Sequence, residues 1–371
     1  MAQAKSAKSA KSPKTENIVF LKAEKVSEWL AEVRRERKVL VPREEGGSIV
    51  FRPFEDGADP VLLLDATVSP KGVILPSCQE LFQFEQSKNP DEPEKLSLNL
   101  SPKVQAEPTV VFGTRPCGAR GFSIFDRVYK GKKFPDPYYA SARDNTLFVT
   151  LTCRNVDNTC FCNWVGGGPA DPTGSDVLAT AVEGGYVLEA VSERGKALLK
   201  SSLLTSGKEK AKEAETAKAR VKSKLQKAPD ISKIPDALLT LFDDMPFWEE
   251  VSAKCHSCGA CTYLCPTCYC FNISDEATGL SGKRFRTWDN CMSYQFSLEA
   301  SGHNPRPTKA HRLRNRVGHK FSYYPKLHSG LIACVGCGRC IKSCPVSMDI
   351  REIVLDAIEH AKNKNKEVSN G

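Results

Sequence analysis

One cysteine spacing occurs twice in this chain of 371 residues, and it restricts the fold more than any other feature. In each copy, two residues separate the first cysteine from the second and the second from the third. Three residues separate the third cysteine from the fourth, which directly precedes a proline. The two copies consist of Cys255, Cys258, Cys261 and Cys265, and of Cys334, Cys337, Cys340 and Cys344. Soft thiolates at this spacing are the ligands of [4Fe–4S] clusters. The sequence therefore predicts two such clusters.

The fourth cysteine of each run is expected to bind the other cluster, as in two-cluster ferredoxins. We therefore expect crossed ligation. The first cluster is assigned to Cys255, Cys258, Cys261 and Cys344. The second cluster is assigned to Cys265, Cys334, Cys337 and Cys340.

Zinc and disulfides are the alternatives for these cysteines. Structural zinc takes four ligands, usually from two separated pairs, whereas each run here has three closely spaced thiols and a fourth before a proline. The start of the chain shows no apolar signal-peptide core, and disulfides need an oxidising compartment. No apolar stretch has the length of a membrane helix. We expect a cytoplasmic protein whose sixteen cysteines point to metal binding and not to a disulfide scaffold.

The net charge of +9 is concentrated in two places. Lysines recur through the first sixteen residues, which read as a tail of low complexity. The second stretch contains Arg306, Lys309, Arg312, Arg314, Arg316 and Lys320. Anionic clusters nearby are the simpler reason for these cations. Nucleic-acid binding is the alternative, and no nucleic-acid fold motif accompanies the charge.

The chain divides into four predicted segments. Residues 1–16 are a disordered basic tail, 17–205 an α/β domain, 206–246 a charged helical linker and 247–371 a dicluster ferredoxin-type domain with a large insertion. The fold class is α+β: a mixed α/β domain followed by an elaborated, mainly helical domain that holds both clusters. Short apolar runs predict strands at 39–42, 48–51, 61–64, 109–113, 146–152 and 185–190. Helical patterns cover 23–37, 192–204, 208–227 and 350–363.

Four further cysteines lie in the first domain, at or after the ends of predicted strands, where α/β folds place functional groups. They are Cys117, Cys153, Cys160 and Cys162. These thiols suit a third [4Fe–4S] cluster, while zinc and unligated buried thiols remain open. The glycines at 166–168 would let backbone approach a sulfur or a phosphate.

The remaining cysteines carry weaker signals. Cys268, Cys270 and Cys291 follow the first run and are expected to pack beside a cluster; a separate metal site with His303 is the alternative. Cys78 is expected in the core. His256, inside the first run, is expected at the surface.

The sequence resembles a family of dicluster subunits of anaerobic redox complexes. The resemblance is strongest over 258–271, 286–292, 302–309 and 334–340, and extends to 136–140 and 159–162. The family includes the beta subunit of sulfhydrogenases and the A subunit of anaerobic sulfite reductase, with relatives in heterodisulfide-reductase-like flavin complexes. It implies that Cys268, Cys270 and Cys291 belong to the family pattern, and it strengthens the third site. The chain departs from the pattern at Gly118, where an acidic residue is expected, and at Cys78, where a polar one is expected.

The expected function is electron transfer. The resemblance implies an iron–sulfur subunit that relays single electrons between partners, such as a flavin or nicotinamide subunit and a hydrogenase or reductase subunit. We assign no catalytic residue, because no nucleophile–base pair or nucleotide fingerprint is found. An enzyme with its own site in the first domain and a nucleic-acid-binding iron–sulfur protein are the alternatives.

Overall fold

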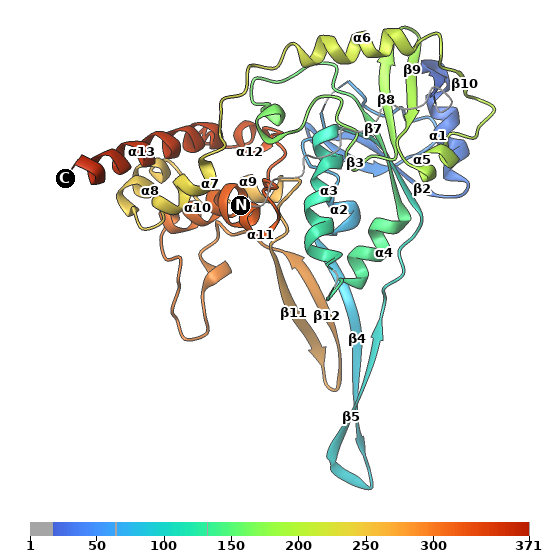
Figure 1. Ribbon diagram of the computed structural model, residues 1–371. Coiled ribbons are helices and arrows are strands. Elements are labelled where there is room, and N and C mark those ends of the chain that lie inside the picture. Colours follow the sequence, from blue (N-terminus) through green and yellow to red (C-terminus); the bar gives the residue numbers. More distant parts are fainter. Residues whose placement is uncertain (1–17, 64, 132, 371) are drawn as a thin grey trace.

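The computed structural model describes residues 18–63, 65–131 and 133–370 (Figure 1). The predicted tail at 1–16 therefore lies outside the described residues. The larger of two sheets has eight strands in the order β10-β1-β9-β8-β7-β6-β2-β3. They are β1 (Ile18–Lys22), β2 (Lys38–Glu45), β3 (Ser48–Pro53), β6 (Thr109–Thr114), β7 (Thr146–Leu151), β8 (Val177–Val182), β9 (Gly185–Ala190) and β10 (Thr205–Ser206).

The centre of this sheet is parallel: β2, β6, β7 and β8 pair in parallel, and the outer pairs are antiparallel. Every residue of β6 and β7 is buried, as expected for strands covered on both faces. One face packs on α1 (Val26–Arg34) through Trp29 and Leu30. The other packs on α2 (Lys71–Ile74), α3 (Pro116–Tyr129) and α4 (Pro137–Asn145).

The smaller sheet has four antiparallel strands in the order β11-β12-β4-β5, and its two hairpins project from the body (Figure 1). They are β4 (Cys78–Asn89), β5 (Glu92–Pro102), β11 (Phe271–Thr278) and β12 (Ser281–Trp288). Arg286 of β12 lies opposite Gln79 of β4. The sheet thus joins the predicted first domain to the insertion of the cysteine-rich region.

The cysteine-rich region combines that hairpin with helices. The longer helices are α7 (Ile234–Thr240), α8 (Met245–Ser252), α10 (Lys309–Gly318) and α13 (Ile350–Asn370). Short ones are α9 (Ala260–Tyr263), α11 (Tyr324–Leu327), α12 (Arg339–Lys342), the 3-10 turn Gln295–Ser297 and the π-helical segment His319–Tyr323, which continues α10.

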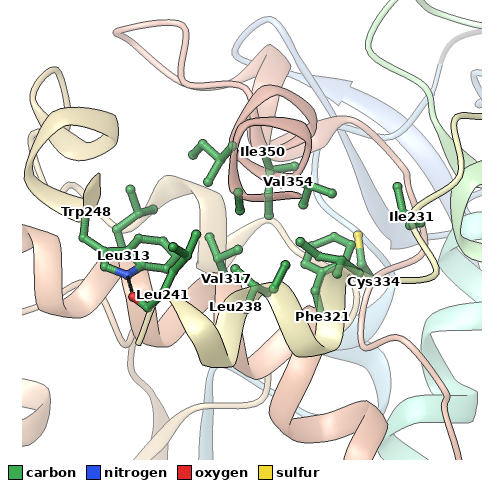
Figure 2. Packing of buried hydrophobic residues seen from close by; sticks show 14 of the residues in the cluster. Ile231, Leu238, Leu241, Trp248, Leu313, Val317, Phe321, Cys334, Ile350 and Val354 are labelled. Carbon is green, nitrogen blue, oxygen red and sulfur yellow. Dashed lines mark hydrogen bonds between the residues drawn. The ribbon is translucent and has the colours of Figure 1, made fainter. Parts of the chain in front are cut away.

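These helices share one apolar core, shown in Figure 2. Leu313 and Val317 of α10 meet Val354 of α13 there. Trp248 anchors α8, because its indole Nε1 donates a 2.7 Å hydrogen bond to the carbonyl oxygen of Leu241. Phe161, from the predicted first domain, is also a member of this core.

Several predicted elements need correction. The helix expected at 192–204 is only α5 (Glu193–Leu198), because the chain then turns and the Ser201 hydroxyl donates to Glu32. No strand forms at 61–63; Val61 makes a single backbone bond to Pro42, and residue 64 lies outside the description. The linker helix α6 (Ala211–Lys222) is not free of an apolar face, since Ala214 and Val221 are buried and α6 packs on β8.

Candidate iron–sulfur sites

The two cysteine runs fold into loops of the same backbone shape. The residue two positions after the first cysteine is left-handed in both, with φ of +56° at Ser257 and +63° at Gly336. A second left-handed residue, Gly259 (φ +77°) or Gly338 (φ +72°), directly precedes a short helix. The sequence repeat is therefore a structural repeat, in which each loop curls around its own cysteines.

Backbone N–H groups in these loops point at cysteine sulfurs. The bonds join Ser257 N to Cys255 Sγ at 3.4 Å, Gly336 N to Cys334 Sγ at 3.4 Å and Met348 N to Cys344 Sγ at 3.3 Å. Such bonds become stronger when the sulfur carries negative charge, as a cluster-bound thiolate does.

Two cavities lie inside the cysteine runs. The first cavity is lined by Cys255, Cys258, Cys261 and Cys344, with Cys340 at its inner wall. The second cavity is lined by Cys265, Cys334, Cys337 and Cys340. The structure thus brings each crossed set of four cysteines to one cavity: Cys344 lines the first and Cys265 the second.

A third cavity gathers the four cysteines of the first domain, Cys117, Cys153, Cys160 and Cys162. Cys117 lies in the first turn of α3 after β6, and Cys153 follows β7. Because β6 and β7 are parallel, both thiols come to the same edge of the sheet. The loop after Cys153 brings the other two back to this edge.

The three cavities form a series. Cys337 lines both the second and the third cavity. Cys340, Arg316 and Ile350 line both the first and the second. The second cavity is therefore in the middle, and each neighbouring pair shares a wall.

Buried cations accompany the thiols. Lys320 Nζ donates to Cys265 Sγ at 3.4 Å, and Arg339 Nη1 lies 3.7 Å from Cys117 Sγ. Burial raises the pKa of the Cys261 thiol to about 11 and that of Cys334 to about 12, so these two thiols would be neutral at pH 7 when unligated. Metal binding would replace the thiol protons and leave negatively charged sulfurs near the cations. The donor sets fit iron–sulfur clusters.

A single metal ion fits less well. Across the described residues, no three histidine, cysteine, aspartate or glutamate side chains lie close enough together to hold one. A structural zinc ion needs four such ligands around it.

The other cysteines are placed as follows. Cys291 is buried, and a hydrogen bond from it lowers the pKa of the Cys270 thiol. The backbone N–H of Cys268 donates to the carbonyl oxygen of Cys265, which lines the second cavity. Cys78 is exposed, not in the core, because it begins β4 on the projecting sheet. His256 is exposed as expected, and so is His303.

The glycines at 166–168 surround an arginine. Arg120 donates to the carbonyl oxygen of Val165 at 3.2 Å and pairs with Asp171 at 2.5 Å. A side chain at Gly166 or Gly167 would contact Arg120. The sequence did not predict that Arg316 lines the first two cavities or that Arg339 contacts Cys117. The density of cations at 306–320 was the one signal for Arg316.

Comparison with known proteins defines the class. A model of the 4Fe–4S dicluster domain matches residues 254–348, so this region is that of an iron–sulfur dicluster protein. The sulfhydrogenase 2 subunit beta of Pyrococcus furiosus is 31% identical over 247 residues, which cover 65% of this chain and 71% of that protein. The chain belongs to the family of sulfhydrogenase beta subunits. No solved structure matches it.

These findings bear out the resemblance and the prediction of iron–sulfur clusters, and they support a role in electron transfer. In the described part of the chain, no helix has the length and apolar character needed to span a membrane.

Proposed function

We propose that this chain is an electron-relay subunit that holds three [4Fe–4S] clusters in a row. The observation that carries this proposal is the shared walls: Cys340 lies between the first and second cavities, and Cys337 between the second and third. Thiols in neighbouring cavities are then close enough for clusters to exchange electrons. The clusters supply the redox chemistry, and the chain supplies spacing, potential and docking.

The proposed ligands are the sets that line the cavities. Cys255, Cys258, Cys261 and Cys344 hold the first cluster, and Cys265, Cys334, Cys337 and Cys340 hold the second. The third is held by Cys117, Cys153, Cys160 and Cys162. The backbone N–H groups of Ser257, Gly336 and Met348 orient the sulfurs.

The series has two ends, and each end faces a different partner. The first cavity opens beside Cys258, which is exposed. The third cavity opens beside Lys342, on the other side of the series. We infer a cytoplasmic, anaerobic complex in which one end meets a hydrogenase or reductase subunit and the other a flavin or nicotinamide subunit. The relative's name as a sulfhydrogenase subunit supports the first of these partners.

Iron and acid-labile sulfide analysis after anaerobic purification tests the proposal. Three clusters correspond to about twelve irons per chain and two clusters to about eight, since each cube holds four. A chain that carried zinc alone, or about four irons after full reconstitution, would contradict the relay. Co-purification of the native complex identifies the two partners.

A further inference from the structure

Three buried cations follow one another at helical spacing. Arg312 and Arg316 belong to α10, and Lys320 belongs to the π-helical segment that continues it. Their exposed fractions are 8%, 5% and 4%. Residues four apart lie on the same face of a helix, so this face presents a row of positive charge to the cysteine loops.

The first and last cations of the row have protein partners. Arg312 donates from Nε to the carbonyl oxygen of Met292 at 2.9 Å and from Nη2 to Ser257 Oγ at 3.3 Å. Lys320 donates to Cys265 Sγ at 3.4 Å, to Thr267 Oγ1 at 3.0 Å and to the carbonyl oxygen of Ala333 at 3.1 Å. Arg312 is thus held in the first loop, and Lys320 is held at the second cavity.

The middle cation differs. The Nε atom of Arg316 is buried and has no hydrogen-bond partner among the described residues. A buried donor without a partner is unfavourable, and a buried cation is rare unless negative charge balances it. Arg316 lines the first cavity and also the second. Its positive charge therefore lies beside the space where the two crossed cysteine sets meet, with Cys261 and Cys340 as its charged neighbours.

We propose that Arg316 is a positioning residue shared by the first two clusters, and that it raises the reduction potential of both. This inference rests on the proposed function. Reduction adds a negative charge to each cavity, and a cation at short range in a medium of low polarity stabilises the reduced form. Because Arg316 lines both cavities, its charge acts on two centres at once. Lys320 touches a ligand of the second centre alone and acts there.

Redox titration of the full reconstituted chain, followed by electron paramagnetic resonance, tests this. The signals are assigned to the two clusters with Cys344→Ser and Cys265→Ser. Arg316→Met fills similar space without charge and is expected to shift both midpoint potentials in the negative direction. Arg316→Gln should also shift both midpoint potentials in the negative direction, and it replaces Arg316→Met as the test if that variant does not fold. Arg316→Lys should restore most of both shifts.

Two controls sharpen the result. Lys320→Gln should shift the second midpoint only. Arg314→Gln should shift neither, because Arg314 instead donates to the carbonyl oxygen of Phe242 at 2.7 Å and lies over that ring. The inference is overturned if the Arg316 variants leave either midpoint at its wild-type value, or if Arg314→Gln shifts both equally. A wild-type chain with fewer than about eight irons would contradict the proposed function itself, and this inference with it.

Discussion

The backbone N–H of Phe161 donates a 2.9 Å hydrogen bond to the carbonyl oxygen of Gly336. This bond joins the loop of Cys160 and Cys162 to the loop of Cys334 and Cys337. Residues far apart in the sequence thereby form one wall, with the third cavity on one side and the second on the other. The contact fixes the distance between the two thiol sets.

Replacement of Gly336 by alanine should break this wall. A Cβ atom there would lie 2.4 Å from the Phe161 carbonyl oxygen, and φ is +63°. Strain in the left-handed region costs about 1 kcal/mol, and the backbone clash adds to it, so we expect a loss of more than about 2 kcal/mol in the free energy of unfolding. Denaturant titration measures it.

Gly330→Ala is the matched control. Gly330 has φ of +82° but nothing within 4 Å of its added Cβ. It should lose about 1 kcal/mol from conformational strain alone. Equal losses in the two variants would show that the Phe161 contact adds nothing.

Crossed ligation predicts opposite effects of two substitutions. Cys265→Ser should perturb the spectrum of the cluster built on Cys334 and its neighbours, because Cys265 lines the second cavity. Cys344→Ser should perturb the cluster built on Cys255, because Cys344 lines the first. Resonance spectra of both variants check this. If each substitution affected the cluster nearest in sequence, the assignment would be reversed.

The third site predicts a loss of iron without damage to the other two. Cys160→Ala should lower the iron content from about twelve to about eight per chain and slow electron flow through the assembled complex. The dicluster signals should persist, because their proposed ligands lie in other loops. Cys78→Ala, at an exposed position, serves as the control and should change neither quantity. Unchanged iron in Cys160→Ala and in Cys162→Ala would make these cysteines structural.

Arg286 connects the smaller sheet to the start of α4, which packs on the larger sheet. This buried side chain of β12 pairs with Asp136 before α4 and donates to Gln79 Oε1 of β4 at 2.6 Å. Arg286→Met leaves a carboxylate without its partner, so we expect a loss of about 3 kcal/mol in stability. Thermal and denaturant unfolding measure this loss.

Arg284, two residues earlier on the same strand, offers the comparison. Its pair with Asp275, at 2.7 Å, is half exposed, and solvent screens such surface pairs so that they contribute little to stability. Arg284→Met should therefore be almost neutral. If Arg284→Met lost as much stability as Arg286→Met, the burial of the Arg286 pair would not be the cause of its larger effect.

Acid should lower the free energy of unfolding, in part through protonation of His319. Burial lowers the pKa of this imidazole to about 4 from 6.5, and its Nε2 lies 3.2 Å from the Tyr269 hydroxyl. The folded state binds the proton more weakly than the unfolded chain. The contribution of the neutral His319 imidazole to folding stability is therefore complete above pH 6.5 and is lost as the pH falls toward 4.

His319→Gln should accordingly lose less stability than the wild type between pH 7 and pH 5, as measured by denaturant midpoints at matched iron content. His303→Gln, at an exposed position, should follow the wild type. If stability fell equally with pH in His319→Gln and in the wild type, His319 would not be a source of the acid sensitivity.

Much of the site was predictable because its signals are local. The repeated spacing predicts loops that curl around their own thiols, and the short apolar runs predict β6 and β7, whose ends carry Cys117 and Cys153. The departure at Gly118 now has a steric reason, since a Cβ there would lie 2.8 Å from Thr114 Oγ1. Only the fold shows this contact.

The rest depends on contacts between distant residues. The pairing of β4 with β12 was missed because register is set across the fold, and Leu96, Leu98 and Leu100 of the neighbouring strand alternate without covering a core. The role of Arg316 was likewise hidden. Its charge was visible in the sequence, but its burial beside both cavities depends on where the fold places α10 relative to the cysteine loops.

The four-stranded sheet can close only late in synthesis of the chain, because its strands lie far apart in the sequence. Gln79 and Arg286 touch across it, yet 207 positions separate them. A ribosome that has finished β4 and β5 must therefore still make the four cysteines of the first domain and the first cysteine run before β12 can close the sheet. Until then the β4 edge is unpaired, which is the condition that invites aggregation. Iron that binds before that closure would meet thiols whose loops are not yet held in place.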